Sequence, residues 1–259
     1  MTASGPGPTT EVSAPAYVEV LTPTLQRVAT SNAQAIGRAA DLLAESLRAD
    51  GVVQAFGSGH SQALAMEVAG RAGGLVPTNQ LAVRDLVVFG GEPPELLSEH
   101  GLERDPEIAR RIYDLANIAP QDVFVIGSSS GVNGSIVEMA SIVKEAGHPL
   151  IAITSLQHTG AVESRHPSGR KLADLADVVL DNGAPRGDAV LPLPGGGAVC
   201  AVSSITAALL VQMLTAEVVR RLLESGETPP VYLSANVPEG DQHNDALEAR
   251  YAGRIRRTA

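Results

Sequence analysis

Residues 126–133 read Ile-Gly-Ser-Ser-Ser-Gly-Val-Asn and stand between an apolar, strand-like run at 123–126 and a helical pattern at 134–146. A strand that enters a glycine turn and then a helix is the repeating unit of a parallel sheet. In such a sheet ligands bind where the strands end, and the following helix offers free N–H groups to an anion. Three consecutive serines exceed what one helix cap can use. The turn therefore predicts a binding site for a phosphate monoester.

A second turn at 56–61, Phe-Gly-Ser-Gly-His-Ser, has the same setting, after a strand-like run and before a helical pattern. Gln62 stands where the dinucleotide fingerprint GxGxxG has its last glycine, and neither turn has the lysine of the GxxxxGK[ST] loop. Nucleotides are therefore a poor match, whereas the hydroxyls of Ser58 and Ser61 suit a monophosphate. The alternative is that the serines of both turns only cap the helices that follow them.

Short apolar runs and helical patterns alternate along the rest of the chain, which predicts a doubly wound α/β fold. The pattern at 17–48 predicts a helix that Pro23 starts or kinks. Further strands are expected at 150–154 and 178–180. Three long stretches that hold histidines fit no regular element and are expected to be functional loops: 82–105, 155–171 and 231–244.

The composition excludes several classes of function. The chain has 259 residues, 44% of them hydrophobic and 19% charged, as is typical of a soluble globular protein. The net charge of −10 argues against nucleic acid and anionic membranes as partners, since either requires a basic face. Polar residues interrupt the apolar stretch at 199–219, which predicts a buried helix rather than a membrane span. Residues 1–16 read as a flexible tail without a secretion signal, and the single Cys200 fits a reducing compartment, so we expect a cytoplasmic protein.

The two turns together resemble the sugar-isomerase, or SIS, family of phosphosugar-binding domains. The family hallmark S-x-S-G-x-[TN] follows a Gly-x-Gly-x-Ser turn, which is matched here at 57–61. The resemblance covers roughly 17–225. Stretches such as SRHPSGRKL at 164–172 are similar to a bacterial subgroup of single-SIS-domain proteins, and this narrower match extends to about Arg257. Four residues carry the hallmark itself: Ser128, Ser130, Gly131 and Asn133.

The resemblance implies a Rossmann-like α/β fold, a three-layer α/β/α sandwich around a five-stranded parallel sheet. It implies that residues 17–257 form a single SIS domain with a C-terminal extension, and that the protein is a homodimer. Relatives include aldose–ketose isomerases, N-acetylmuramic acid 6-phosphate etherases and sugar-phosphate-sensing domains of transcription regulators. The regulators carry a helix-turn-helix domain, for which the N-terminal tail of this chain is too short.

Enzymes of this family remove the weakly acidic proton at C2 of an open-chain sugar phosphate, which requires a positioned base and a donor to the developing oxyanion. A nitrogen at C2 blocks the simple ketose product, whereas the same carbanion can expel the group at C3. We therefore expect a lyase that dehydrates N-acetylglucosamine 6-phosphate by β-elimination of the C3 hydroxyl. The alternatives are an aldose–ketose isomerase and a non-catalytic phosphosugar sensor. The sequence holds no metal-ligand spacing, so we expect neither metal nor cofactor.

Two carboxylates are candidates for the catalytic base. Glu103 is the first choice and lies just before a helix that Asp105 and Pro106 are expected to open. Glu67 lies two turns into the helix that follows the first turn. The etherase and heptose-phosphate isomerase relatives have their glutamate about one turn further along, where this chain has Arg71. The alternative for Glu103 is a helix-start acid that complements the helix dipole.

Two histidines are candidates for assisting departure of the C3 hydroxyl. His60 stands at a helix N-terminus, which favours the neutral ring, and His243 belongs to the polar run at 240–244. For both, the alternative is an ordinary turn or cap position. Asp181, Asn182 and Asp188 are expected either to bind sugar hydroxyls or to bind only the turn that they occupy. Phosphate and sugar contacts are expected from the two turns and a basic loop: Ser58, Gly59, Ser61, Ser128, Ser129, Ser130, Asn133, Arg165, His166 and Lys171.

Overall fold

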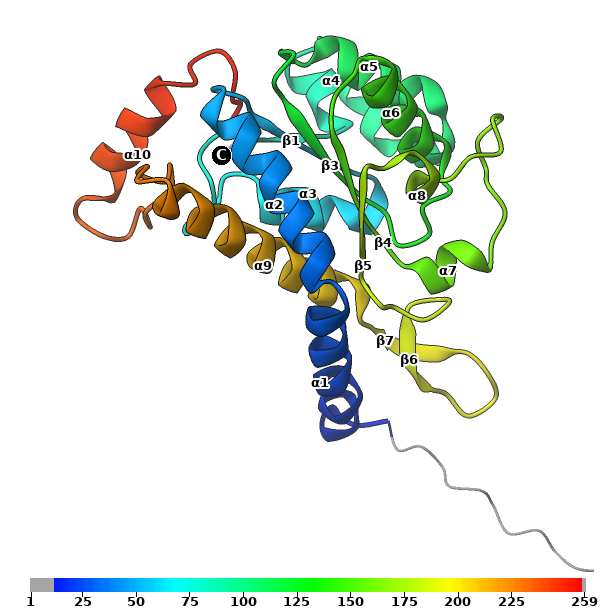
Figure 1. Cartoon of the computed structure of the whole chain (residues 1–259). Helices are drawn as coiled ribbons and strands as arrows, with labels where there is room; N and C mark the ends of the chain where they lie inside the picture. The colour runs from blue at the N-terminus through cyan, green and yellow to red at the C-terminus, as the bar shows by residue number, and fades with distance from the viewer. Residues whose placement is uncertain (1–11, 258–259) are drawn as a thin grey trace, which may run out of the picture.

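The centre of the protein is a five-stranded parallel sheet, which the computed structural model shows within residues 12–257, the part of the chain that it describes (Figure 1). The strands lie in the order β2-β1-β3-β4-β5. This confirms the expected α/β class and the five-stranded sheet. The strands are β1 (Val53–Gly57), β2 (Thr78–Leu81), β3 (Val123–Gly127), β4 (Leu150–Thr154) and β5 (Val178–Asp181).

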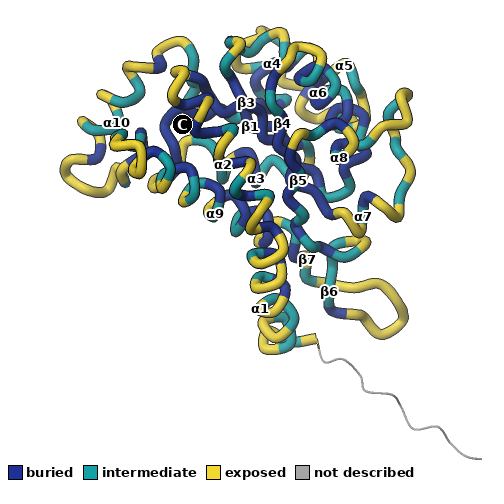
Figure 2. The backbone as a smooth tube through the Cα atoms, in the orientation of Figure 1, coloured by how far each residue is buried: buried dark blue, intermediate teal, exposed yellow. Residues whose placement is uncertain are grey.

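Helices cover both faces of this sheet. Side chains along a strand alternate between its faces, so Val123 and Val125 pack against α1, α2, α3 and α9, whereas Phe124 and Ile126 pack against α4, α5, α6 and α8. Figure 2 shows the strands as the buried centre of the molecule. The helices are α1 (Ala14–Ser31), α2 (Ala33–Arg48), α3 (Gln62–Val68), α4 (Arg84–Val88), α5 (Pro106–Leu115), α6 (Gly134–Glu145), α7 (Leu156–Gly160), α8 (Leu172–Leu175), α9 (Ser203–Glu224) and α10 (Gly240–Ala249).

The single helix predicted at 17–48 is wrong, because α1 and α2 are separate helices that meet at Asn32. The buried amide of Asn32 donates to the carbonyls of Val28 and Asp181. These bonds tie the junction to the end of β5. Pro23 lies inside α1 rather than at its start.

The N-terminal boundary also differs from the prediction. Helix α1 begins at Ala14, so residues 14–16 of the expected tail are helical. The side chain of Ser13 caps this helix by accepting a hydrogen bond from the backbone N–H of Ala16. Residues 1–11 of the expected tail lie outside the described residues.

Several elements were not predicted from the sequence. Strand β2 was missed, and so was the antiparallel hairpin of β6 (Ala189–Pro192) and β7 (Ala198–Ala201), which lies beside α1 in Figure 1. The long stretches expected to be loops contain α4, α7, the start of α10 and two short 3₁₀ helices, η2 (Pro94–Ser98) and η3 (Leu102–Arg104). The apolar stretch expected to be a buried helix overlaps α9. Within residues 12–257, no helix is long and apolar enough to span a membrane.

The last described residues, 254–257, run along the edge strand β2, and we call them the C-terminal strap. The amide nitrogen of Asn79 donates to the carbonyl of Arg254 (2.7 Å), and its oxygen accepts from the backbone N–H of Arg256 (2.7 Å). The guanidinium of Arg257 donates to two backbone carbonyls within residues 76–78. The strap therefore satisfies polar groups at the open edge of the sheet.

A buried carboxylate anchors the strap to the sheet. The side chain of Asp122 is fully buried and accepts from Gln54 and from the backbone N–H of Val52, both 2.9 Å away. The guanidinium of Arg254 pairs with the same carboxylate at 2.6 Å. Because a buried charge needs both a counter-ion and hydrogen bonds, this arrangement makes the position of the strap specific.

Helix α5 begins as the sequence predicted, and its cap is open to a direct test. Asp105 is the cap residue, and its carboxylate accepts from the backbone N–H of Glu107 (3.0 Å), with Pro106 in the first turn. Loss of such a cap typically costs about 1 kcal/mol. We expect Asp105→Ala to lower the free energy of unfolding by about this amount, measured by urea denaturation. The Asp105→Asn variant should keep most of it, and equal losses in both variants would contradict the capping role.

Candidate functional site

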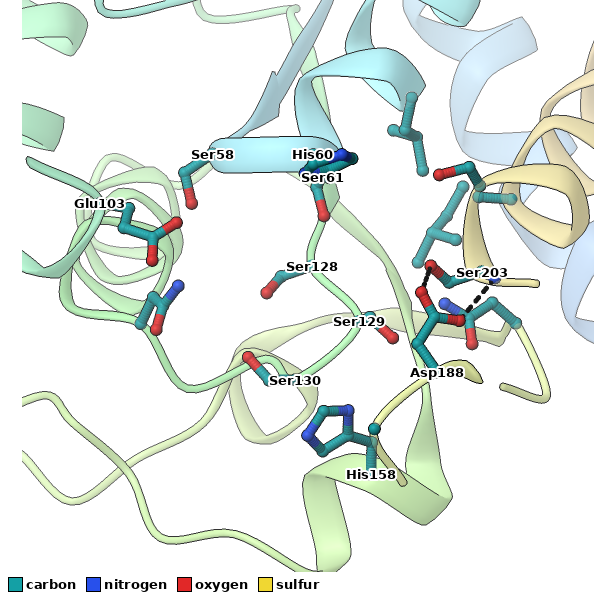
Figure 3. A pocket seen from close by; sticks show the side chains of 17 residues that line it. Ser58, His60, Ser61, Glu103, Ser128, Ser129, Ser130, His158, Asp188 and Ser203 are labelled. Carbon is teal, nitrogen blue, oxygen red and sulfur yellow. Dashed lines mark hydrogen bonds between the residues drawn. The ribbon is translucent and has the colours of Figure 1, made fainter. Parts of the chain in front are cut away.

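A cavity of about 270 Å³ opens at the carboxyl ends of β1 and β3, between the two serine turns. We call it the serine pocket. Figure 3 shows Glu103 on one side of it, Asp188 on the other, and serine hydroxyls between them. Its lining includes Ser58, His60, Ser61, Leu64, Glu103, Ser128, Ser129, Ser130, Asn133, Ile153, His158, Asn182, Gly187, Asp188, Ser203, Ser204 and Ala207.

The first turn follows β1 and has no room for larger residues at its glycines. A Cβ at Gly57 would lie 2.2 Å from the carbonyl oxygen of Ser61. Gly59 has a φ of +55°, and a Cβ there would lie 2.8 Å from a carboxylate oxygen of Glu103. The turn continues into the 3₁₀ helix η1 (Gly59–Ser61), which leads into α3. The backbone therefore approaches Glu103 closely, and Ser58 faces the same cavity.

Hydrogen bonds of its backbone carbonyls and of the Ser128 hydroxyl hold the second turn in place. The Ser128 hydroxyl accepts from the backbone N–H of Gly131 (3.1 Å). The carbonyl of Ser129 accepts from the N–H of Ser155, and the carbonyl of Ser130 accepts from the Thr159 hydroxyl (2.8 Å). These bonds tie the turn to the segment that follows β4.

The capping alternative for the serine turns does not describe this structure. Ser58 and Ser61 stand at the cap positions of η1 and α3, and neither side chain makes a capping hydrogen bond. Asn133 stands at the cap position of α6, also without a side-chain cap. The polar side chains of these three residues line the serine pocket instead.

Two buried polar atoms of the pocket lining have no hydrogen-bond partner within residues 12–257: Oγ of Ser129 and Nδ1 of His158. A buried polar atom without a partner costs about 1–3 kcal/mol, so native proteins rarely keep one without a reason. Both residues line the serine pocket. A polar ligand that reached both would remove this cost.

Glu103 lies on η3, and the start of α6 holds it in place. The Ser135 hydroxyl donates to the carbonyl of Glu103 (2.8 Å). A Cβ at Gly134 would lie 2.1 Å from the carbonyl oxygen of Arg104, so α6 and η3 are packed backbone to backbone. Because α6 also begins directly after the second serine turn, the carboxylate and the turn share one rigid support.

Asp188 closes the opposite side of the pocket. Its carboxylate accepts from the backbone N–H groups of Val202 (3.1 Å) and Ser203 (2.8 Å), and from the Ser203 hydroxyl (2.6 Å). Asp188 has a φ of +70°, which is uncommon for a residue with a side chain. The Ser203 proton is committed to Asp188, so this side of the pocket presents oxygen acceptors to a ligand.

Among the predicted site residues, Glu103, His60 and serines of both turns come together at the serine pocket. Other predicted site residues lie elsewhere. Glu67 forms an ion pair with Arg71 and accepts from Gln212, and it does not line the serine pocket. The Nε2 atom of His243 bonds to the carbonyl of Val231 (3.0 Å), also away from the pocket.

The basic loop contacts the second turn, where the backbone N–H of Arg165 donates to the carbonyl of Val132 (3.0 Å). Arg165 donates to the side-chain oxygen of Asn133 (3.1 Å). His166 pairs with Glu138 (2.9 Å), and Lys171 donates to the carbonyl of Thr159 (2.7 Å). None of the three basic residues lines the serine pocket itself.

Sequence reasoning did not include His158 or Ser203 among the site residues. His158 follows β4 and Ser203 begins α9, so only the fold brings them to the serine turns. The one available signal was the presence of histidines in the stretch 155–171. Within the described residues, no group of three or more His, Cys, Asp or Glu side chains is arranged to hold a metal ion.

Comparison with known proteins gives the family of this chain. Residues 16–155 match the family profile described as the SIS domain. The chain belongs to the SIS domain family. Both serine turns and Glu103 lie inside the matched range, whereas Asp188 and Ser203 lie beyond it.

The SIS relatives include proteins that carry the family name UPF0309. One from Listeria monocytogenes is 41% identical over 226 residues, which cover 87% of this chain and 91% of the relative. Another, from Geobacillus kaustophilus, is 35% identical over 240 residues, which cover 92% and 94% respectively.

Solved structures show the same fold. A phosphoheptose isomerase from Francisella tularensis superposes with a TM-score of 0.54 at 18% identity, covering 79% of this chain and 95% of that one. The phosphoheptose isomerase of Neisseria gonorrhoeae has a TM-score of 0.51 at 20% identity, covering 78% and 95%. At these identities the similarity shows a shared fold only. The chemistry of this chain has to be inferred from its own residues.

Proposed function

We propose that this protein is an enzyme of phosphosugar metabolism that dehydrates an amino-sugar 6-phosphate, N-acetylglucosamine 6-phosphate, by β-elimination. The observation that carries the proposal is the convergence of two serine turns on one cavity, with hydroxyls that cap no helix and with Glu103 at its side. The SIS fold and the phosphosugar chemistry of this fold in its isomerase relatives support the choice of substrate class.

The phosphate binds to the serine turns in this proposal. The buried Ser129 hydroxyl lacks a partner, and Ser58, Ser61 and Ser130 present further hydroxyls to the same space. Hydroxyl and N–H donors at the starts of helices stabilise a phosphate without lysine or arginine. This explains how a chain with a net charge of −10 can bind an anion.

Glu103 is the proposed base. Its carboxylate is half-buried, lines the pocket and has no hydrogen-bond or ion-pair partner within residues 12–257. It takes the proton from C2, and the electron pair of that C–H bond forms the C2–C3 double bond as the C3–O bond breaks. A histidine protonates the departing hydroxyl, which leaves as water.

His158 and His60 are the histidines that can supply this proton, because both line the pocket and His243 does not. The unpartnered Nδ1 of His158 is available to a ligand oxygen, whereas His60 is exposed at the rim. The acceptors Asp188 and Ser203, on the far side, suit the remaining sugar hydroxyls.

The proposal also includes a homodimer in the cytoplasm. Large apolar side chains are exposed on α1, on the β6–β7 hairpin and at the start of α9, and α1 contacts both β6 and α9. A second copy of the chain would cover them. They are Val18, Leu193, Val199 and Ile205.

Product mass tests the reaction. We expect incubation with N-acetylglucosamine 6-phosphate to give a product lighter by one water. An isomer that keeps the composition of the substrate, apart from deuterium taken up at C2 from deuterated water, would contradict the dehydration and favour an isomerase. Unchanged substrate, together with binding in calorimetry, would contradict an enzyme and favour a sensor of phosphosugars. Absence of binding by any hexose or hexosamine 6-phosphate would overturn the proposal as a whole.

A further inference from the structure

A second cavity, of about 330 Å³, lies on the other side of Glu103. We call it the acyl chamber. It shares Ser58 and Glu103 with the serine pocket, so these two residues form the boundary between the two spaces. The chamber is otherwise lined by Phe56, Gly57, Gly59, Gln62, Val83, Arg84, Leu97, Glu99, His100, Gly101, Leu102, Ile108 and Ser135.

The walls of the chamber are of two kinds. Phe56 and Ile108 are each only 1% exposed, and with the half-buried Val83 and Leu102 they give the chamber an apolar floor. Polar side chains, including Gln62, lie among the remaining lining residues. Arg84, Glu99 and His100 also line the chamber, so only its floor is apolar, and this floor favours a hydrocarbon group over a charged one. A short hydrocarbon group attached through an amide fits both kinds of wall.

The boundary between the two cavities is narrow because Gly59 has no side chain. A Cβ at this position would lie 2.8 Å from a Glu103 carboxylate oxygen. The carboxylate of Glu103 therefore faces ligand space on both sides. When a carbon atom gives its proton to Glu103, its neighbouring substituent can enter the acyl chamber while the phosphate stays at the serine turns.

We propose that this chamber binds the acyl group on the C2 nitrogen of the substrate and so selects N-acylated over unsubstituted sugar phosphates. This inference rests on the proposed function, which places C2 at Glu103. The chamber is as large as the serine pocket, so it accepts acyl groups longer than acetyl.

Calorimetric titration of the full chain with three ligands tests the chamber: glucosamine 6-phosphate, N-acetylglucosamine 6-phosphate and the N-butyryl analogue. We expect the acetyl group to tighten binding by about tenfold, since it buries a methyl group and an amide, and the butyryl analogue to bind at least as tightly as the acetyl compound. Equal affinities for the acetylated and the free amino sugar would overturn the inference and leave the proposed function intact. No binding by any of the three would overturn the proposed function.

Two variants with larger side chains in the chamber lining test whether the chamber causes the preference for the acetylated sugar. Leu97 is 50% exposed on η2, so Leu97→Trp enlarges the side chain without disturbing the core, and Val83→Phe fills the chamber from the side of α4. Leu223→Trp, at a residue 59% exposed on α9, is the matched control. We expect at least one filled variant to lose the acetyl preference while keeping its affinity for glucosamine 6-phosphate.

The control should keep both affinities, and thermal unfolding should show that the variants are folded. If both filled variants keep the full acetyl preference, or if they weaken the binding of both sugars equally, the acyl group binds elsewhere and the inference is wrong.

Discussion

Glu103→Gln is expected to lower kcat by about 10²–10⁴-fold while leaving the dissociation constant of N-acetylglucosamine 6-phosphate nearly unchanged. A positioned base typically contributes this factor, and glutamine keeps the size of the side chain without its ability to take a proton. The affinity should persist because the serine turns, and not Glu103, hold the phosphate. Single-turnover rates and calorimetry measure the two quantities separately.

Glu107→Gln is the matched control for this experiment. Glu107 is an exposed carboxylate in the first turn of α5, only four positions further along the chain, and it lines neither cavity. It should keep full activity. If Glu103→Gln were as active as the native chain, the base would be another residue, even with the dehydrated product confirmed.

Gly134→Ala is expected to reduce kcat/KM by about 100-fold and the free energy of unfolding by about 1–3 kcal/mol. The added Cβ would meet the carbonyl oxygen of Arg104 at 2.1 Å, so η3 must move away from α6. Over-packing of this kind typically costs this much stability. Glu103 precedes Arg104 directly, and a displacement of about 1 Å in a catalytic group can cost 10²-fold in rate.

Gly37→Ala provides the comparison. Gly37 lies inside α2, where a Cβ would meet the Arg221 guanidinium at an ordinary distance of 3.6 Å, far from the serine pocket. This variant should retain activity and gain slightly in stability, because alanine is the better helix former. Unchanged kcat/KM in Gly134→Ala would show that the position of Glu103 does not depend on the packing of α6 against η3.

The central part of the fold was predictable because its signals are local. The β-branched and apolar runs of β3 and β4 are buried on both faces, so each reads as a short continuous apolar segment. The edge strand β5 alternates buried and half-buried residues but keeps the apolar run Val-Val-Leu. Strand β2, with the sequence Thr-Asn-Gln-Leu, has no such run. Its place in the sheet depends on pairing with β1 and on contacts with the C-terminal strap, which no local pattern contains.

The site was predictable to the same extent. The serine turns follow predicted strands, and parallel strands bring their carboxyl ends to one edge, so both turns were expected at that edge. The pairing of β1 with β3, which the sequence did not predict, makes Ser58 and Ser128 neighbours. Glu67 shows the limit of this reasoning. Distance along the chain from a turn does not say which way a helix side chain points, and its partners Arg71 and Gln212 draw it away from the pocket. His158 and Ser203 reach the pocket from elements that only the tertiary fold places there.

The C-terminal strap has a consequence for the behaviour of the protein at high concentration. Strand β2 is an edge of the sheet, and an uncovered edge offers unpaired N–H and C=O groups to a strand of another molecule. The Arg257 guanidinium donates to the carbonyls of Val76 and Thr78, and the Asn79 side chain on β2 bonds to the backbone of the strap within the same chain. The strap thus protects the sheet from edge-to-edge aggregation. A protein engineered to lack residues 254–257 would expose β2, which could then pair with a strand of another molecule.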